Sequence, residues 1–349
     1  MLMRLSIMVS NRWLAILGLT ACFWSALQAQ RADSRYRIKE IYFFGGAGLD
    51  TEKVRRSLPI HPGDEIPKDK MSDIFNAANE VVRRETGKSA TDIAPVTVNA
   101  TDWNLYIGLS GQSSHPLKFR PTPRGKMVLP VELIDSYKKT LDLLPEALKH
   151  GAGEDDSSGY ALSSYPALRE AQLRLHSLAQ KNEDVVLRTL GGSGDAFHRE
   201  AAATALGYCD ASKRQIAALV AATHDESGEV RNNATRALSV LGMSKSTLAT
   251  EISADPFIAM INSGTWTDRN KGSFMLISLT ASRKPALLRS LREKAFDSLA
   301  EMADWDAEHC LIAQLILGRI GGLPDAKTVE LSRAGKASEI VAVARNAHV

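Results

Sequence analysis

A helical pattern that recurs at a fixed interval constrains the fold of this chain most strongly. Arg199 is repeated 32 residues later as Arg231, and the small and apolar residues that follow each arginine match as well. The two copies read Arg199-x-x-Ala202-x-x-Ala205-Leu206 and Arg231-x-x-Ala234-x-x-Ala237-Leu238. A constant offset at several positions is typical of stacked helical repeats, in which each unit buries its apolar face against its neighbours.

The repeat continues more weakly through the second half of the sequence. Its alanines, at three-residue spacing, lie on one helix face and let a neighbouring helix approach closely, and an apolar helix at 215–223 follows the first copy. Weaker copies begin near Arg169 and Arg269. We therefore expect an all-α solenoid over residues 131–335, followed by a C-terminal tail at 336–349.

These residues resemble HEAT repeats, in particular the short bacterial type named after phycobilisome lyases. The resemblance is close over residues 195–242 and looser over 165–335. It implies a curved solenoid whose inner surface binds other proteins. It also implies that Arg199 and Arg231 join aspartates in a ladder between repeats, although ligand binding by these arginines is the alternative. A lyase activity is not implied, because the repeat positions do not encode it.

Residues 31–111 follow a different pattern, in which strand and helix signals alternate. The expected elements are a strand at 36–44, helices at 51–58 and 68–85, and strands at 93–98 and 103–109. In the last strand, Trp103, Leu105, Ile107 and Leu109 alternate with residues that are able to face solvent. The pattern predicts a small α+β domain with the order strand, helix, helix, strand, strand.

That order, together with two short motifs, resembles a POTRA domain. The motifs are Ile38-x-x-Ile41-x-Phe43-x-Gly45 and Leu58-x-x-x-Pro62-Gly63-Asp64. The resemblance covers the α+β domain and implies a location outside the cytoplasm. It also implies that partners bind by adding a strand to a sheet edge. A single copy without a following β-barrel pattern departs from the translocation members of that family.

The strand at 93–98 is the candidate edge. Pro95 lacks an N–H group and is tolerated in a strand where the missing donor points outward. Val96, Thr97 and Val98 are therefore candidate partner-binding residues. The alternative is that Pro95 protects this edge from pairing. On the solenoid, the exposed second helices offer a further candidate, Lys213.

The first 29 residues are typical of a secretory signal. Arg4 and Arg12 precede an uncharged apolar stretch at 13–27, and the small residues Ala26 and Ala29 suit cleavage after Ala29. Two alternatives keep the chain at a membrane. The leader is retained as an anchor, or Cys22 is lipidated, because Leu19-Thr20-Ala21-Cys22 resembles a lipobox.

Residues 112–130, rich in proline, glycine and serine, are expected to form a linker between the two regions. The formal net charge of +3 and an aromatic content of 6% give no basic, stacking surface of the kind that nucleic acids bind. With 44% hydrophobic and 24% charged residues the chain has the composition of a folded protein that is not multi-spanning.

Catalytic and metal-binding spacings are missing from the sequence. Gly46-x-Gly48 follows a strand as a phosphate-binding loop would, but the rest of that motif is absent, so a simple turn is expected. Residues 154–156, Glu-Asp-Asp, lack the later glutamate of a calcium loop and are expected to be a solvated charge run. Neither a catalytic residue nor a metal or cofactor is therefore predicted.

We conclude from the sequence that the chain is a non-catalytic, exported, protein-binding scaffold or assembly factor of the cell envelope. It is expected in the periplasm, or on a membrane if Cys22 is lipidated or the leader stays attached. The alternative is an enzyme or an enzyme-activating subunit whose site assembles only in three dimensions. That alternative requires a histidine and a carboxylate that converge in a cleft.

Overall fold

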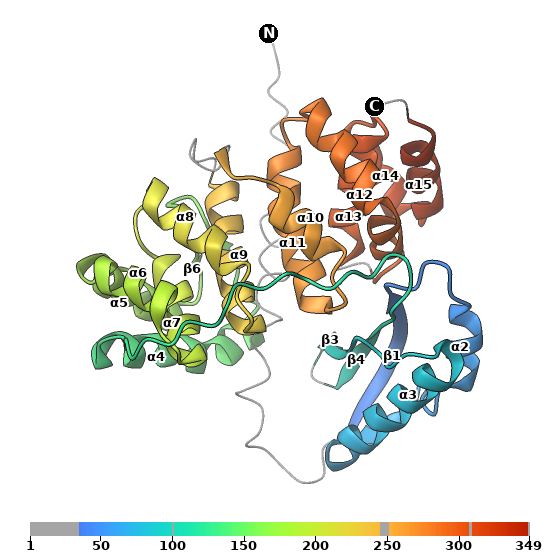
Figure 1. The fold of residues 1–349 in the computed structure, drawn as a ribbon, viewed down its shortest axis with the longest axis horizontal. Helices are drawn as coiled ribbons and strands as arrows, with labels where there is room; N and C mark the ends of the chain where they lie inside the picture. Colours follow the sequence, from blue (N-terminus) through green and yellow to red (C-terminus); the bar gives the residue numbers. More distant parts are fainter. Residues whose placement is uncertain (1–34, 100, 245–250, 307–308, 348–349) are drawn as a thin grey trace. The chain divides into compact units, whose positions relative to one another are not determined.

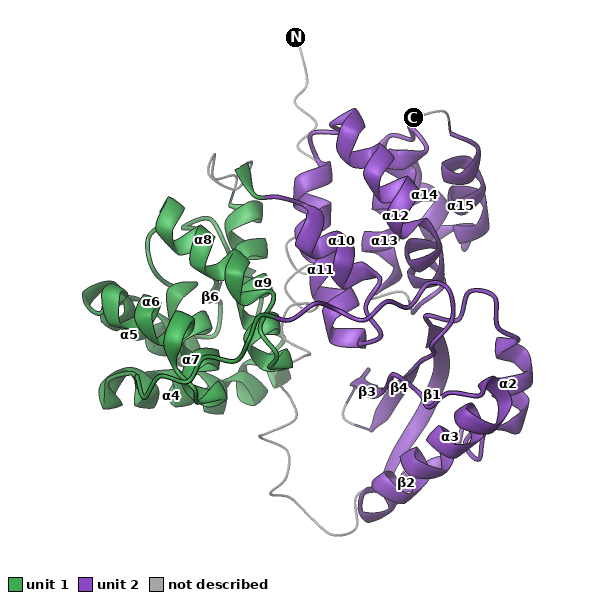
Figure 2. Ribbon diagram, in the orientation of Figure 1, with its two compact units in different colours: residues 1–28, 120–252 green, residues 29–119, 253–349 purple. Residues whose placement is uncertain are grey.

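The computed structural model of the chain describes residues 35–99, 101–244, 251–306 and 309–347 (Figure 1). The predicted leader, Cys22 included, lies outside the described residues. The chain divides into two compact units (Figure 2): unit 1 holds the described residues of 120–252, and unit 2 holds those of 29–119 and 253–349. The division falls within the helical region.

Unit 2 contains a four-stranded mixed sheet with the strand order β2-β1-β4-β3. The strands are β1 (Arg35–Phe44), β2 (Glu65–Pro67), β3 (Asp92–Thr97) and β4 (Asp102–Gly108). β1 runs parallel to β4, and the other two pairs are antiparallel. The sequence pattern missed β2, because three residues after a turn are too few to show an alternation. The remaining strands and helices follow the predicted order.

Two helices of the sheet region, α2 (Thr51–Ser57) and α3 (Met71–Thr86), begin and end where local signals place them. The Asp50 side chain accepts a hydrogen bond of 2.9 Å from the Lys53 N–H and so caps α2. α3 ends at Gly87, whose φ of 77° is favourable for glycine. Both helices cover one face of the sheet, where the core residues are Ile38, Ile41, Val54, Leu58, Val82, Leu105, Ile107 and Leu109.

The opposite face of the sheet is buried as well. Asn104 and Tyr106, which the alternation of β4 leaves for solvent, are 1% and 0% exposed. The Tyr106 ring lies 5.3 Å from that of Trp266, which begins α11, and 5.1 Å from that of Trp305, which follows α12. The expectation of a solvent-facing side is therefore wrong, because the period of two identifies two faces but not what covers each of them.

The helices of unit 2 that follow the sheet region pack in pairs. They are α10 (Asp255–Ile261), α11 (Trp266–Thr280), α12 (Pro285–Ala303), α13 (Cys310–Ile320), α14 (Asp325–Arg333) and α15 (Ala337–Asn346). In the sheet region of the same unit, a 3-10 turn at Lys68–Lys70 precedes α3. Gly272 of α11 faces α10 so closely that a Cβ atom there would lie 2.9 Å from the Met260 Cβ atom. Glycine at this position therefore allows the close approach of the two helices.

Unit 1 is helical apart from a two-stranded ribbon. Its elements are α4 (Val131–Lys149), β5 (Glu154–Asp155), β6 (Leu162–Ser163), α5 (Pro166–Lys181), α6 (Glu183–Gly192), α7 (Ala196–Leu206), α8 (Lys213–Ala222) and α9 (Gly228–Met243). A Cβ atom at Gly207 would lie 2.7 Å from that of Ala237, so small residues do let α7 and α9 approach closely. Ser212 and Gln215 form a capping box at the start of α8. The unit is a set of packed helix pairs.

None of the helices in the described part of the chain is long and apolar enough to cross a membrane. Cys209 and Cys310 are buried free thiols, and burial raises their pKa values to about 12 and about 11. Both therefore act as small apolar residues of the core, as the sequence predicts.

Candidate functional site

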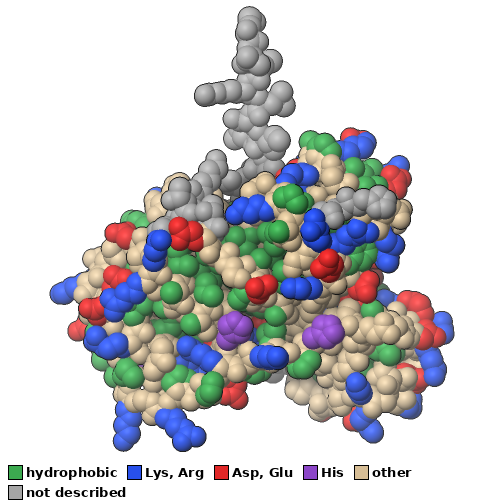
Figure 3. Space-filling view, turned by 45° about the horizontal axis from the view of Figure 1, so that its top comes forward, with side chains coloured by type: hydrophobic (Ala, Val, Ile, Leu, Met, Phe, Trp, Pro, Cys, Tyr) green, Lys and Arg blue, Asp and Glu red, His purple; other side chains and the backbone are tan. Residues whose placement is uncertain are grey.

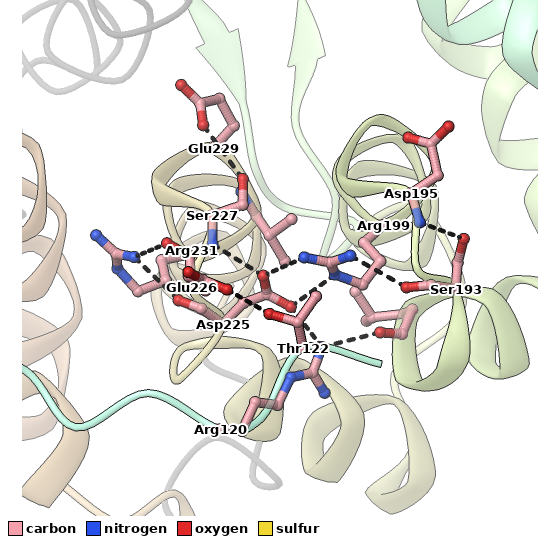
Figure 4. A network of polar contacts seen from close by, with 12 residues as sticks. Arg120, Thr122, Ser193, Asp195, Arg199, Asp225, Glu226, Ser227, Glu229 and Arg231 are labelled. Carbon is pink, nitrogen blue, oxygen red and sulfur yellow. Dashed lines mark hydrogen bonds and ion pairs between the residues drawn. The ribbon is translucent and has the colours of Figure 1, made fainter. Parts of the chain in front are cut away.

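A buried ion pair connects successive helix pairs of unit 1 (Figure 4). Arg199 of α7 and Asp225, in the turn before α9, are 2% and 1% exposed. Nε and Nη2 of Arg199 donate to the carboxylate at 2.9 and 2.8 Å. Arg120 donates to the same carboxylate at 2.6 Å and to the Leu190 carbonyl at 2.9 Å. Two guanidinium groups thus share one buried carboxylate.

This arrangement is structural rather than a ligand site. Burial alone would raise the pKa of Asp225, but the hydrogen bonds from Arg199 and Arg120 outweigh it and hold that pKa below its usual range. Both carboxylate oxygens are occupied by these donors. The expected contact between Arg199 and an aspartate of the next repeat is present, and the ladder interpretation of this arginine is preferred to ligand binding.

Three arginines share one geometry relative to the turn that precedes their helix. Arg199 donates to the Ser193 carbonyl, Arg231 to the Asp225 carbonyl and Arg269 to the Ser263 carbonyl, at 3.0, 2.9 and 2.7 Å. Each acceptor lies six residues before its donor. Arg269 belongs to the weakest of these three sequence copies, yet it makes the same contact. The alanines and leucines of the motif are buried apart from the half-buried Ala237: Ala202, Ala205, Leu206, Ala234 and Leu238.

The predicted linker makes backbone contacts with these same turns. In unit 1, the Arg120 N–H donates to the His224 carbonyl at 2.8 Å, and residues 125 and 193 form a parallel bridge. In unit 2, the His115 N–H donates to the Asn262 carbonyl at 2.7 Å. The proline-rich composition therefore accompanies an extended, hydrogen-bonded segment.

The glycine-rich loop after β1 binds an anion, and the anion is a side chain of the same unit. The consecutive N–H groups of Gly45, Gly46 and Ala47 donate to the carboxylate of Glu301 on α12 at 2.8, 2.9 and 3.1 Å. The Ser113 hydroxyl donates to it at 2.6 Å. A row of backbone N–H groups in a turn is a typical cradle for an anion.

A buried arginine also binds Glu301, and we call the contacts of Gly45–Ala47, Ser113 and Arg269 with this carboxylate the Glu301 clamp. Arg269 is 0% exposed and donates to the Glu301 carboxylate at 3.0 Å and to the Ser113 carbonyl at 2.6 Å. Burial lowers the pKa of Arg269 to about 10, so the guanidinium is still charged at neutral pH. The expectation of a simple turn at Gly46-x-Gly48 is therefore incomplete. The loop has the donors of an anion cradle, and Glu301 occupies them.

A histidine and a carboxylate do converge in unit 2. His309 Nδ1 and a carboxylate oxygen of Asp306 lie 2.7 Å apart, and the Tyr106 hydroxyl donates to the other oxygen at 3.1 Å. Asn104 donates to that second oxygen too. Burial alone would raise the pKa of Asp306, but the hydrogen bonds and the charge of His309 outweigh it and hold the pKa low. The His309 side chain is 1% exposed, so the dyad lies in the core and joins the sheet to the helices.

Asp92, on the edge strand β3, also joins the sheet to the helices. Its carboxylate accepts a hydrogen bond of 2.9 Å from the N–H of Trp266, the first residue of α11. Burial, and to a lesser degree the charge of Asp268, raises the pKa of Asp92 to about 6. The folded chain therefore binds this proton more tightly than an unfolded chain, in which an aspartate has a pKa of about 3.9.

We expect Asp92→Asn to remove part of the pH dependence of stability. With the folded pKa above the unfolded one, the contribution of Asp92 to the free energy of unfolding falls as pH rises from about 4 to about 6. An asparagine oxygen still accepts from Trp266 without a charge to bury. Urea unfolding at pH 4.5 and pH 7 should show a smaller decrease for D92N than for the wild-type chain. Asp69→Asn, at an exposed aspartate, is the matched control, and an equal change in both variants contradicts the assignment.

A groove opens beside β1 in unit 2, with a volume of about 970 Å³. Its lining comes from β1 and the loop after it, from α2, from the C-terminal half of α12 and from α15. Residues that represent these elements are Ile41, Phe43, Arg55, Ala300, Asp304 and Ala342. Because the groove is open to solvent and combines a strand edge with apolar and charged side chains, it is the candidate functional site of the chain.

The sequence singled out other positions for partner binding. Val96 and Thr97 belong to β3, which is an edge strand, with Val96 buried and Thr97 half-buried. Val98 follows β3 and its N–H donates to the Asp102 carbonyl. Lys213 begins α8, is exposed and pairs with Glu251 at 3.2 Å. The groove beside β1 was missed, because its lining residues come from distant parts of the sequence.

The charged side chains at the surface and those of the predicted charge run at 154–156 lie in different environments. On the face drawn in Figure 3, basic side chains are interspersed with acidic ones. Glu154 is not a solvated charge, since it pairs with Arg236 and its side chain is 7% exposed. Burial raises the pKa of Asp156 to about 6. Within the described ranges, no group of three His, Cys, Asp or Glu side chains is arranged to hold a metal ion.

Comparison with known proteins gives no family for this chain. No protein-family model matches it, and no curated protein is similar to it in sequence. The fold and the site define a class all the same: an N-terminal α+β region with a mixed four-stranded sheet, followed by a helical region of packed helix pairs.

Proposed function

We propose that this chain is an exported, non-catalytic protein-binding scaffold or assembly factor of the cell envelope. The observation that carries the proposal is the groove beside β1, because it exposes a strand edge between two helical walls. Export is supported by the pattern of the first 29 residues. In this proposal the sheet region is a POTRA-like domain and the helix pairs are HEAT-like repeats.

The buried polar groups support a binding role over a catalytic one. Asp225 and Glu301 are each saturated by arginine and backbone or hydroxyl donors. Asp306 is held by Tyr106, Asn104 and His309. These groups maintain the fold, so the exposed groove rather than a polar cavity is the surface available for function.

Site-directed photocrosslinking in intact cells tests the proposal. We place a photoreactive residue at Ala342 in the groove, at Thr97 on β3 and at Lys213 on α8, with Asp142, exposed on α4, as the control position. We expect a discrete adduct at Ala342, and the captured protein, once purified, should bind the full chain at a stoichiometric ratio. Adducts no more abundant than at Asp142 from all three positions contradict a binding function.

The Asp306–His309 pair favours a second candidate, an enzyme or an enzyme-activating subunit. His309 Nε2 is buried and has no hydrogen-bond partner among the described residues, so it retains a site for proton transfer. A substrate has no direct access to His309, because this side chain is 1% exposed. This candidate requires a conformational change that opens the core, and it ranks second for that reason.

A further inference from the structure

The outer edge of β1 has no strand along most of its length. β2 pairs with β1 at residues 35–37, and the backbone groups of Ile38 bond to Gly63 and Asp64. Beyond Ile38, no strand in the described part of the chain pairs on that side. The Phe44 carbonyl accepts from the Leu109 N–H at the end of β4, so Phe44 points toward β4. Because backbone groups alternate in direction along a strand, Ile41 and Phe43 direct theirs away from β4 and into the groove.

The groups on this edge are suited to strand pairing. The parallel ladder with β4 uses the backbone groups of Tyr42 and Phe44. Outside that ladder, neither the Ile41 N–H nor the Phe43 N–H donates to a backbone carbonyl of the described residues. The Ile41 carbonyl accepts from Arg55 at 2.8 Å. An added strand would therefore find two donors, and the Phe43 carbonyl as an acceptor.

The other edge of the sheet is less suited to this role. Val98 donates to the Asp102 carbonyl in the same register that pairs Pro95 with Leu105, so the alternation of the ladder points Pro95 outward. A strand added to β3 would meet a residue without an N–H group at the centre of that edge. Of the two interpretations of Pro95, protection of the edge is therefore favoured, and β1 replaces β3 as the edge for pairing.

The groove has two different walls, and an extended segment presents alternate side chains to each of them. One wall is apolar, with Leu49 and Phe43 packed against the core beneath α2. The other wall is formed by α12 and α15, where the small side chains of Ala300 and Ala342 accompany Asp304. A segment that alternates apolar and polar residues matches both walls.

Charge identifies the polar residues of that segment. Glu40, Asp297 and Asp304 line the groove and are exposed, and none of them forms an ion pair within the described residues. Of the two cations of the groove, Arg55 bonds to the Ile41 carbonyl and to Glu52. Arg345 is exposed and lies 4.7 Å from the Phe296 ring centroid, a contact that leaves its charge in place. The three carboxylates outnumber this one cation, so the groove is negative overall.

We infer that the groove binds an extended basic segment of a partner protein, which adds a strand to β1 and directs alternate Lys or Arg side chains toward α12 and α15. Residues 39–44 of β1 give such a segment about 20 Å of edge. The inference rests on the proposed binding function and names its site and the chemistry of its partner. It differs from edge pairing at β3 in both the strand and the charge.

Fluorescence anisotropy with synthetic peptides tests it on the full chain. The probe is a fluorescein-labelled peptide with three Lys-Val repeats, and the comparison peptides replace lysine by glutamate or place proline at the centre. We expect the Lys-Val peptide to bind and both comparison peptides to bind at least about tenfold more weakly. Hydrogen exchange at the Ile41 and Phe43 amides should slow when the Lys-Val peptide is present.

Variants on α12 and at the residue that follows it separate the groove from the rest of the surface. Asp297→Lys combined with Asp304→Lys should weaken binding of the Lys-Val peptide by about tenfold or more. Glu293→Lys, an exposed position on the same helix outside this groove, should leave binding within about twofold. Circular dichroism confirms that the variants are folded.

Methylation of the peptide backbone distinguishes strand pairing from charge attraction alone. In an added strand, alternate N–H groups face β1, so N-methylation of one alternate set should abolish binding and methylation of the other should not. The inference is overturned if the two methylated sets weaken binding equally or if the Glu-Val peptide binds more tightly than the Lys-Val peptide. It is also overturned if E293K loses as much affinity for the Lys-Val peptide as the double aspartate variant does. Crosslinking at Lys213 and Thr97 does not depend on this groove, so the proposed function can survive that result.

Discussion

Replacing Glu301 with alanine is expected to lower the free energy of unfolding of unit 2 by about 3–5 kcal/mol, the usual cost of leaving a buried charge without its partner. The substitution removes the acceptor of three consecutive backbone N–H groups and of the Ser113 hydroxyl. It also leaves Arg269, which is 0% exposed and charged at neutral pH, without its carboxylate. The loop after β1 and α12 then lose their direct connection.

Tryptophan emission in urea measures this effect where it occurs. The tryptophans of the described residues are Trp103, Trp266 and Trp305, which all belong to unit 2. Glu301→Ala should therefore shift the emission transition to lower urea. Glu293→Ala on the same helix is the control and should stay within about 0.5 kcal/mol of the wild type. If the two alanine variants unfold at the same urea concentration, the clamp does not stabilise unit 2.

Local signals predicted most of the elements but not this clamp. Asp50 as a cap, Gly87 as a helix end and the period of two in β4 are all read within a few residues. The contact between the glycine loop and Glu301 joins residues that are 254 to 256 positions apart. No spacing rule connects residues at such separation, so the loop could be predicted as a turn but its anion could not.

The same limit explains the second face of the sheet. The alternation of β4 was correct, and the residues it assigned to solvent are buried because helices from the C-terminal half lie over them. Tyr106 and Asp306, which meet there, are 200 residues apart. A sequence pattern identifies which side chains share a face, whereas the covering partner is decided by tertiary packing.

The predicted linker shows a second reason why contacts could not be predicted from the sequence. Several of its contacts with the repeat turns use backbone groups, for example the N–H of His115 and the N–H of Arg120, although the Arg120 side chain also bonds to Asp225. Backbone hydrogen bonds require no particular side chain, so composition gives no sign of them. The arginine repeat, in contrast, is visible in the sequence because the buried guanidinium group is needed at that position for the contact with the preceding turn.

Asp225→Ala should produce the largest destabilisation in unit 1, again about 3–5 kcal/mol, because it leaves the buried Arg199 guanidinium without a partner. Arg120 loses the same carboxylate. In the wild-type chain the depressed pKa of Asp225 makes its contribution fully present above about pH 4, and that contribution is lost as pH falls below this value. Far-UV circular dichroism in urea measures the change, since the described residues of unit 1 contain no tryptophan.

A double-mutant cycle separates the ion pair from other consequences of the substitution. Arg199→Met keeps most of the side-chain volume without the charge, so combining it with Asp225→Ala removes the unpaired cation. The double variant should therefore be more stable than the sum of the two single losses predicts, with a coupling of about 1–3 kcal/mol. Asp142→Ala, at an exposed position on α4, is the control for loss of an aspartate. Additive losses in the cycle show that Arg199 and Asp225 do not stabilise each other, and the ladder interpretation then fails.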